Sequence, residues 1–151
     1  MSEVSSSSLR RAVRGVEWAA VGIYILFIFT LTHMPIDGAK SSEWMGHGLM
    51  FWINKVLQCG LYAGLAALLG CAMFPLSRDP VKTIENISGV RVTIYLMLMV
   101  TIAIVDEFTQ PLFGRKYELM DVIANIGGVI PGFCLFLVLN ELRHQFLGDR
   151  Q

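Results

Sequence analysis

The chain has 151 residues, of which 54% are hydrophobic and only 16% are charged, and its mean hydropathy is +0.58. Charged side chains make up roughly a quarter of a soluble domain, so this composition indicates a protein of the lipid bilayer. Twelve Lys and Arg balance twelve Asp and Glu. With zero net charge and no basic stripe interleaved with aromatics, the sequence excludes nucleic acid as an expected partner.

Four apolar runs follow one another along the chain, and the first spans Trp18 to Leu31. It follows Arg10, Arg11 and Arg14, as the apolar run of a signal peptide would. No small-x-small cleavage site comes after the run, so we interpret it as an uncleaved first membrane span. His33 ends this span and is interpreted as an ordinary interfacial residue.

The second and third runs are also long enough to cross a bilayer. Val56 to Leu76 contains no charge at all, whereas Val90 to Val105 reaches full length only if Arg91 extends its guanidinium to the interface. Between the first and second runs, Trp44 to Ile53 is rich in aromatic residues, as expected of a segment at the membrane surface.

The fourth run, Leu119 to Leu139, carries polar residues near its beginning and Pro131 in its middle, where we expect a kink. The four runs together predict an all-α polytopic membrane protein, a four-transmembrane-helix bundle with short loops. The expected organisation is an N-terminal tail over residues 1–15, a transmembrane domain over residues 16–140 and a C-terminal tail over residues 141–151.

Orientation follows from the basic residues, because cytoplasmic loops retain an excess of Lys and Arg. With the amino terminus inside the cell, eight basic residues are cytoplasmic and four are outside. The eight are Arg10, Arg11, Arg14, Arg78, Lys82, Arg91, Arg143 and Arg150, and the four are Lys40, Lys55, Arg115 and Lys116. We therefore expect a multi-pass protein of the cell membrane with both termini in the cytoplasm.

Polar residues gather at the predicted outer ends of three spans. On the second helix, Asn54, Gln58 and Tyr62 follow at i, i+4 and i+8 and so share a face, with Lys55 at its mouth. On the third helix, Asp106, Glu107 and Gln110 precede Pro111, which should end the helix. On the fourth, Glu118, Asp121 and Asn125 form one stripe, and Arg115 lies in the connection before it.

A polar group left facing lipid costs several kcal/mol, so these stripes should face one another. The small-xxx-small pairs Gly60 with Gly64 and Gly128 with Gly132 would let the helix backbones pack closely. Arg115 and Lys55 suit an anionic group, whereas the carboxylates suit a hard cation or acid–base chemistry. Alternatively, Arg115 pairs with the carboxylates and the stripes only hold the helices together.

Metal, cofactor and disulfide chemistry are not expected. Cys59, Cys71 and Cys134 each lie in an apolar run and are interpreted as free thiols, and the three histidines lack metal-ligand spacing. No nucleophile elbow, phosphate-binding glycine loop or HExxH helix is present in the sequence.

Two motifs of the chain resemble those of VanZ-like membrane proteins. One is Asp106-Glu107-Phe108-Thr109-Gln110, then Gly114-Arg115, then Asp121-Val122-Ile123-Ala124-Asn125-Ile126-Gly127 and Gly132. The other, Asn54-Lys55-Val56-Leu57-Gln58 with Tyr62 and Leu65, is similar to the family's DKxxHxxxYxxL motif. Asn54 and Gln58 replace the family's usual Asp and His, and Phe113 stands where the family usually has Pro.

The resemblance implies a role in the cell envelope, because the family is named for a membrane protein linked to glycopeptide (teicoplanin) resistance. We therefore expect a protein that binds or handles an envelope amphiphile, either a lipid-linked wall precursor or a glycopeptide. Two alternatives are a membrane enzyme acting on a lipid head group, which the lack of a recognisable nucleophile disfavours, and a structural subunit of a larger membrane complex. The expected ligand-binding residues are Asn54, Lys55, Gln58, Tyr62, Asp106, Glu107, Gln110, Arg115, Asp121 and Asn125.

Overall fold

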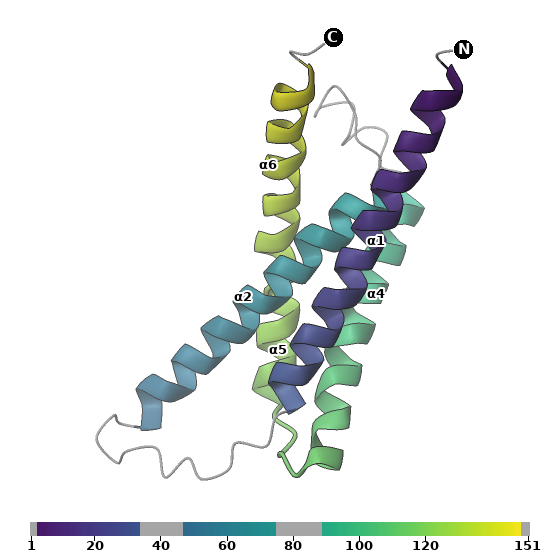
Figure 1. The fold of residues 1–151 in the computed structure, drawn as a ribbon. Coiled ribbons are helices and arrows are strands. Elements are labelled where there is room, and N and C mark those ends of the chain that lie inside the picture. The colour runs from purple at the N-terminus through teal and green to yellow at the C-terminus, as the bar shows by residue number, and fades with distance from the viewer. Residues whose placement is uncertain (1–2, 34–46, 75–88, 149–151) are drawn as a thin grey trace.

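The computed structural model describes residues 3–33, 47–74 and 89–148, and these residues form helices and no strand (Figure 1). The elements are α1 (Glu3–His33), α2 (His47–Met73), α4 (Gly89–Thr109), the 3-10 helix η1 (Gln110–Phe113), α5 (Leu119–Gly127) and α6 (Val129–Gly148). Four stretches are long and apolar enough to cross a membrane: Arg11–His33, Phe51–Met73, Gly89–Phe113 and Leu119–Leu142. The predicted all-α fold with four membrane-crossing helices is confirmed, and the chain is a multi-pass membrane protein.

The helices extend beyond the predicted spans wherever no helix breaker intervenes. α1 begins at Glu3 and α6 continues to Gly148, so most of each expected tail is helical. α2 ends at Met73 instead of Leu76, because the proline at position 75 disfavours helical geometry in the residue before it. α4 ends before Pro111 as predicted, and the chain then forms the single turn of η1.

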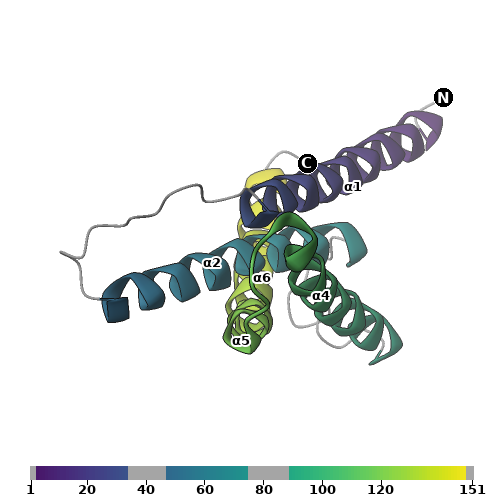
Figure 2. The same ribbon diagram turned by 90° about the horizontal axis from the view of Figure 1, so that it is seen from below.

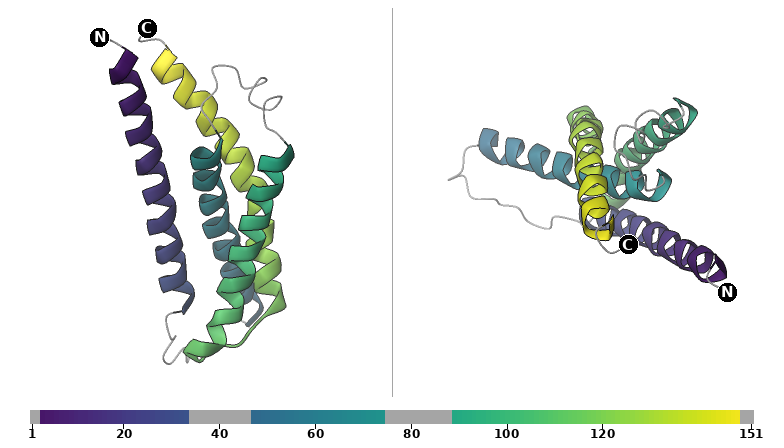
Figure 3. Two further views of the ribbon diagram at one scale, coloured as in Figure 1. Left: turned by 90° about the vertical axis from the view of Figure 1, so that its right-hand side faces the viewer. Right: turned by 90° about the horizontal axis from the view of Figure 1, so that it is seen from above.

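The first turn of α1 and the last turn of α6 lie at the same end of the bundle, as four passes require (Figures 1 and 3). The connection from η1 to α5 lies at the opposite end. Several residues used for the orientation argument, Lys40, Arg78, Lys82 and Arg150, lie outside the described residues, as does Trp44. Which end faces the cytoplasm stays a prediction.

α2 is the central helix, and it packs against α1, α5 and α6. Its contact with α6 depends on glycine: a Cβ at Gly132 would meet the backbone of Ala63, and one at Gly128 would meet the backbone of Cys59 and of Ala63. Gly64 instead faces Tyr24 of α1, and a Cβ at Gly60 would meet nothing within 4 Å. The prediction that glycine pairs let the helix backbones pack closely is therefore correct for Gly128 and Gly132. It is wrong for Gly60 of the other pair.

The fourth span is interrupted at Gly128, between α5 and α6. Pro131 has no N–H for the carbonyl of Gly127 and its ring crowds that carbonyl, so the regular hydrogen-bond ladder is broken there. The chain stays helical across the break because the Gly128 N–H bonds the carbonyls of Ala124 and Asn125, at 3.1 and 3.2 Å. The break lies one turn before the proline, where a proline kink is expected.

The first turns of α2 extend away from the other helices (Figure 2). The side chains described there are exposed, among them Trp52 and Ile53, in keeping with the aromatic surface segment expected before the second span. Asn54 is exposed as well. Lys55 is the first described side chain of α2 that is buried in the bundle.

Candidate functional site: a polar cluster at one end of the bundle

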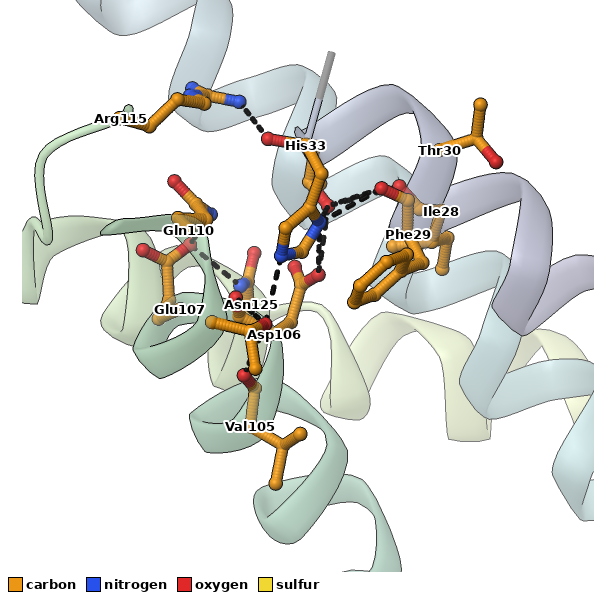
Figure 4. A network of polar contacts seen from close by, with 12 residues as sticks. Ile28, Phe29, Thr30, His33, Val105, Asp106, Glu107, Gln110, Arg115 and Asn125 are labelled. Atoms are coloured by element: carbon orange, nitrogen blue, oxygen red, sulfur yellow. Dashed lines mark hydrogen bonds and ion pairs between the residues drawn. The ribbon is translucent and has the colours of Figure 1, made fainter. Parts of the chain in front are cut away.

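Buried polar side chains concentrate at the end of the bundle where α1 and α4 finish and α5 begins (Figure 4). Among the described residues, only Asn140 is buried and polar elsewhere. α1, α2, α4 with η1, and α5 all contribute. We call this set the polar cluster: Thr32, His33, Lys55, Gln58, Tyr62, Asp106, Glu107, Gln110, Asp121 and Asn125.

Asp106 of α4 is held by hydroxyl groups from two other helices. Thr32 of α1 donates to its Oδ1 at 2.8 Å, and Tyr62 of α2 donates to its Oδ2 at 3.1 Å. Each carboxylate oxygen therefore has a donor, although the side chain is only 5% exposed. Hydrogen bonds to an ionised acceptor are about twice as strong as neutral ones, so this carboxylate ties α1, α2 and α4 together.

His33 lies inside the cluster, which corrects its interpretation as an ordinary interfacial residue. Its Nδ1 is 2.8 Å from the carbonyl of Phe29 and 3.6 Å from Asp106 Oδ1, and its Nε2 is 2.8 Å from Thr109 Oγ1. The ring stacks on Phe29 with a centroid distance of 3.8 Å and meets the edge of Phe113 at 4.8 Å. Packing on both sides fixes the imidazole between α1 and α4.

Lys55 is paired within the protein. Its ammonium donates to Glu118 Oε2 at 2.9 Å, contacts Asp121 Oδ1, and lies 4.7 Å from the ring centre of Phe51. Glu118 is the residue that precedes α5, and Asp121 is in the first turn of that helix, where a negative charge is favourable. The ion pair therefore joins the first turn of α5 to α2.

Glu107 is fully buried and has one partnered oxygen and one unpartnered oxygen. Gln110 donates from Nε2 to Glu107 Oε1 at 2.8 Å, and Asn125 approaches the same oxygen at 3.5 Å. Glu107 Oε2 has no hydrogen-bond partner among the described residues. The amide oxygens of Gln58, Gln110 and Asn125 are likewise buried without a donor in the described part of the chain.

Arg115, in the connection between η1 and α5, is half-buried beside the polar cluster. Its Nη1 donates to the backbone carbonyl of Thr32, one of the carbonyls that the last turn of α1 leaves without a helical partner (Figure 4). Gly114 makes this approach possible: its φ of 80° is left-handed, which favours glycine, and its N–H closes the preceding turn. Among the described residues, Arg115 forms no ion pair within 4 Å, unlike the pairing with carboxylates considered from the sequence.

An apolar cavity of about 180 Å³ lies beside the polar cluster, between α1, α2 and α4. Its apolar walls include Ile25 and Ile28 of α1, Leu65 of α2, and Ile102 and Val105 of α4. Tyr62 and Asp106 line the same cavity. Because these two residues also bond each other within the cluster, the cavity and the polar network share a wall.

The structure brings together eight of the ten residues predicted for the site, each of them buried, and places Arg115, half-buried, beside them. The tenth, Asn54, is exposed and separate, because the buried face of α2 runs through Lys55, Gln58 and Tyr62 at i, i+3 and i+7. Thr32, His33 and Thr109 were not predicted for the site, and Glu118 was expected in the polar stripe of the fourth helix but not among the ligand-binding residues. The signal for Thr32 and His33 was their position: two polar residues end an apolar run at the same membrane level as the other stripes.

No protein-family model matches the chain, and no curated protein or solved structure is significantly similar to it. The resemblance of its two motifs to VanZ-like proteins therefore stays a prediction, and the site has to be interpreted from its own geometry.

Proposed function

We propose that this membrane protein binds a cell-envelope amphiphile, such as a lipid-linked wall precursor, with its apolar chain in the cavity and its head group at the polar cluster. The observation that carries the proposal is the shared wall formed by Tyr62 and Asp106. An amphiphile needs an apolar slot that ends in fixed polar groups, and this arrangement offers both within one side-chain length. The resemblance to VanZ-like proteins supports an envelope ligand and a contribution to glycopeptide resistance.

Arg115 is the best candidate to anchor an anionic head group. A guanidinium has five N–H donors, and the described contacts engage only Nη1, with the carbonyl of Thr32. The remaining donors suit the paired oxygens of a phosphate or carboxylate. Lys55 is a weaker candidate than expected, because Glu118 and Asp121 already neutralise its charge.

The role of the cavity is tested by narrowing it with Val105→Trp. The measurement is the amount of lipid that the detergent-purified chain retains, determined by native mass spectrometry. Val105 lines the cavity and is 51% exposed, so an indole fits there without unfolding the bundle. We expect about tenfold weaker retention, equivalent to ~1.4 kcal/mol. Ile104→Trp is the matched control, since Ile104 is the neighbouring exposed residue and does not line the cavity. Equal retention by both variants would contradict the proposal.

The role of Arg115 in binding an anionic head group is tested by comparing Arg115→Ala with Lys116→Ala. For each variant, lipid binding is measured with lipids that have the same acyl chains and differ in head-group charge. Lys116 is the exposed neighbouring cation, so its removal controls for the general loss of positive charge. We expect Arg115→Ala to reduce the preference for anionic over zwitterionic lipid, and Lys116→Ala to leave it unchanged. The same loss in both variants would assign the preference to surface charge.

A second candidate function, an enzyme acting on a lipid head group, gains support from one observation. Thr109 Oγ1, His33 and Asp106 lie in the order of a nucleophile, a base and an orienting carboxylate. Against it, His33 Nδ1 is nearer to the Phe29 carbonyl than to Asp106, at 2.8 against 3.6 Å. Thr109 Oγ1 also bonds the carbonyls of its own helix, at 2.8 and 2.9 Å. Binding is therefore the better-supported function.

Thr109→Val separates the two functions, because it removes the hydroxyl and keeps the shape of the side chain. Turnover of lipid phosphates or esters by the purified chain, abolished by Thr109→Val with lipid retention intact, would establish the enzyme. Retention without turnover in the unmodified chain supports binding alone.

A further inference from the structure

We infer that the polar cluster contains a binding site for a hard monovalent cation, formed by the carboxylate of Glu107 and the amide oxygens of Gln110, Asn125 and Gln58. This inference goes beyond the amphiphile-binding function and does not depend on it. It also departs from the expectation, based on the sequence, that the chain binds no metal.

The buried oxygens of these side chains favour a positively charged ligand, because they have no hydrogen-bond donor among the described residues. Glu107 Oε2, Gln110 Oε1 and Asn125 Oδ1 belong to side chains that are at most 1% exposed, and none has a donor among the described residues. A buried acceptor without a partner costs about 1–3 kcal/mol, and one positively charged ligand can satisfy several such acceptors at once. The side chains of Gln110 and Asn125 both lie against the Glu107 carboxylate, since each approaches its Oε1 with an amide nitrogen (Figure 4).

Gln58 belongs to the same level of the bundle, although it lies on α2. The contact of Lys55 with Asp121 fixes one point of the α2–α5 register, and the approach of Gly128 to Cys59 and Tyr62 fixes another. Because Gln58 lies between these two points of α2, we infer that it is at about the level of Asn125 on α5. Its own amide oxygen is also buried without a donor in the described part of the chain.

The ligand chemistry is that of a hard cation. Carboxylate and carbonyl oxygens are the groups that replace the hydration shell of alkali and alkaline-earth ions in proteins. In membrane proteins, buried ionisable groups facing the bundle interior commonly mark ion sites. The described residues contain no group of three or more His, Cys, Asp and Glu side chains that could hold a metal ion, which disfavours a transition metal.

The charge of the site favours one positive charge. Asp121 is neutralised by Lys55, and both oxygens of Asp106 accept hydroxyl donors. Among the described residues, Glu107 is therefore the carboxylate of the cluster that has an oxygen with neither a hydrogen-bond donor nor an ion-pair partner. A single carboxylate surrounded by neutral amides balances Na⁺ or K⁺ and leaves a divalent ion undercompensated.

The test is direct binding of radioactive sodium, and of rubidium as a potassium probe, to the full chain in detergent. The buffer contains a bulky organic ammonium as its only other cation. We expect saturable binding of one ion per chain for one of the two probes, with a matching rise in the unfolding temperature as that salt is added at constant ionic strength.

Glu107→Gln should abolish the saturable binding, because it replaces the charge while keeping an oxygen for Gln110. Glu118→Gln is the matched control: Glu118 lies at the same end of the bundle, but its side chain is 52% exposed and pairs with Lys55. Gln110→Met, which removes an amide oxygen at similar volume, should weaken binding about tenfold. Absence of saturable binding by the unmodified chain, or binding that survives Glu107→Gln, would overturn the inference.

Discussion

The two ends of the bundle bury their residues in different ways. Where α2 finishes and α4 begins, Phe74, Tyr95, Phe133 and Phe136 pack with ring centres 5.5 to 6.3 Å apart. The polar group of that aromatic cluster, the Tyr95 hydroxyl, donates a hydrogen bond to the carbonyl of Ala66 at 3.0 Å. At the other end, the polar cluster has more buried acceptors than donors.

This difference separates a region that only stabilises the fold from one that has the chemistry to do more. An aromatic cluster with its single hydroxyl satisfied is a complete packing solution. A cluster that leaves several acceptors unpaired lowers stability, and such violations of the packing rules are expected at functional sites. Three sets of variants test this difference between the two ends.

The largest effect is expected at Lys55. Lys55→Met keeps the length of the side chain but leaves Asp121 buried without its counter-ion, which typically costs about 3–5 kcal/mol. The free energy of unfolding in mixed detergent micelles measures the loss. Adding Asp121→Leu should restore most of it, because the second substitution removes the uncompensated charge. A stable single variant would show that the ion pair does not hold α5 against α2.

An intermediate effect is expected where α2 crosses α6, between the two ends. Gly132→Val would push its side chain into the backbone of Ala63 and force the helices apart, and overpacking of this kind costs about 1–3 kcal/mol. Gly60→Ala is the control, since a Cβ there meets nothing within 4 Å. Equal stability of the two variants in the same unfolding measurement would argue against the close α2–α6 crossing.

Effects of similar or smaller size are expected from removing one hydroxyl at each end. Tyr62→Phe withdraws one of the two donors from the buried carboxylate of Asp106 and should cost about 1–3 kcal/mol. Tyr95→Phe removes a bond to a carbonyl that keeps its helical partner and should cost about 0.5–1.5 kcal/mol. A larger loss for Tyr95→Phe in parallel unfolding curves would reverse the comparison.

Hydropathy and periodicity predicted the four spans because helices in lipid must satisfy their own backbone and need a fixed apolar length. The same reasoning placed Gln58, Asp106, Asp121 and Asn125 in one cluster, since buried polar groups have to meet. Helix ends were less predictable, because α1 continues through a serine-rich segment that contains no Pro or Gly breaker.

Finer features of the site required coordinates. Spacing placed Asn54 on one face of α2 with Gln58 and Tyr62, and this was wrong: the crossing with α5 buries Lys55 and leaves Asn54 exposed. Sequence could not show that His33 packs between two aromatic rings, or that Arg115 meets the end of α1 instead of a carboxylate. The cavity also depends on how α1 and α4 diverge on either side of α2, which no local pattern encodes (Figure 3).

The proposed function requires the apolar chain of an amphiphile to enter between α1 and α4, next to Asp106. A phospholipid with a photoactivatable group in its acyl chain, incorporated with the protein into nanodiscs, tests this directly. We predict that mass spectrometry will find crosslinks concentrated on cavity residues such as Ile25, Ile102 and Val105, and that Val105→Trp will remove them. Crosslinks spread evenly over the exposed faces of all four spans, unchanged by Val105→Trp, would contradict the account.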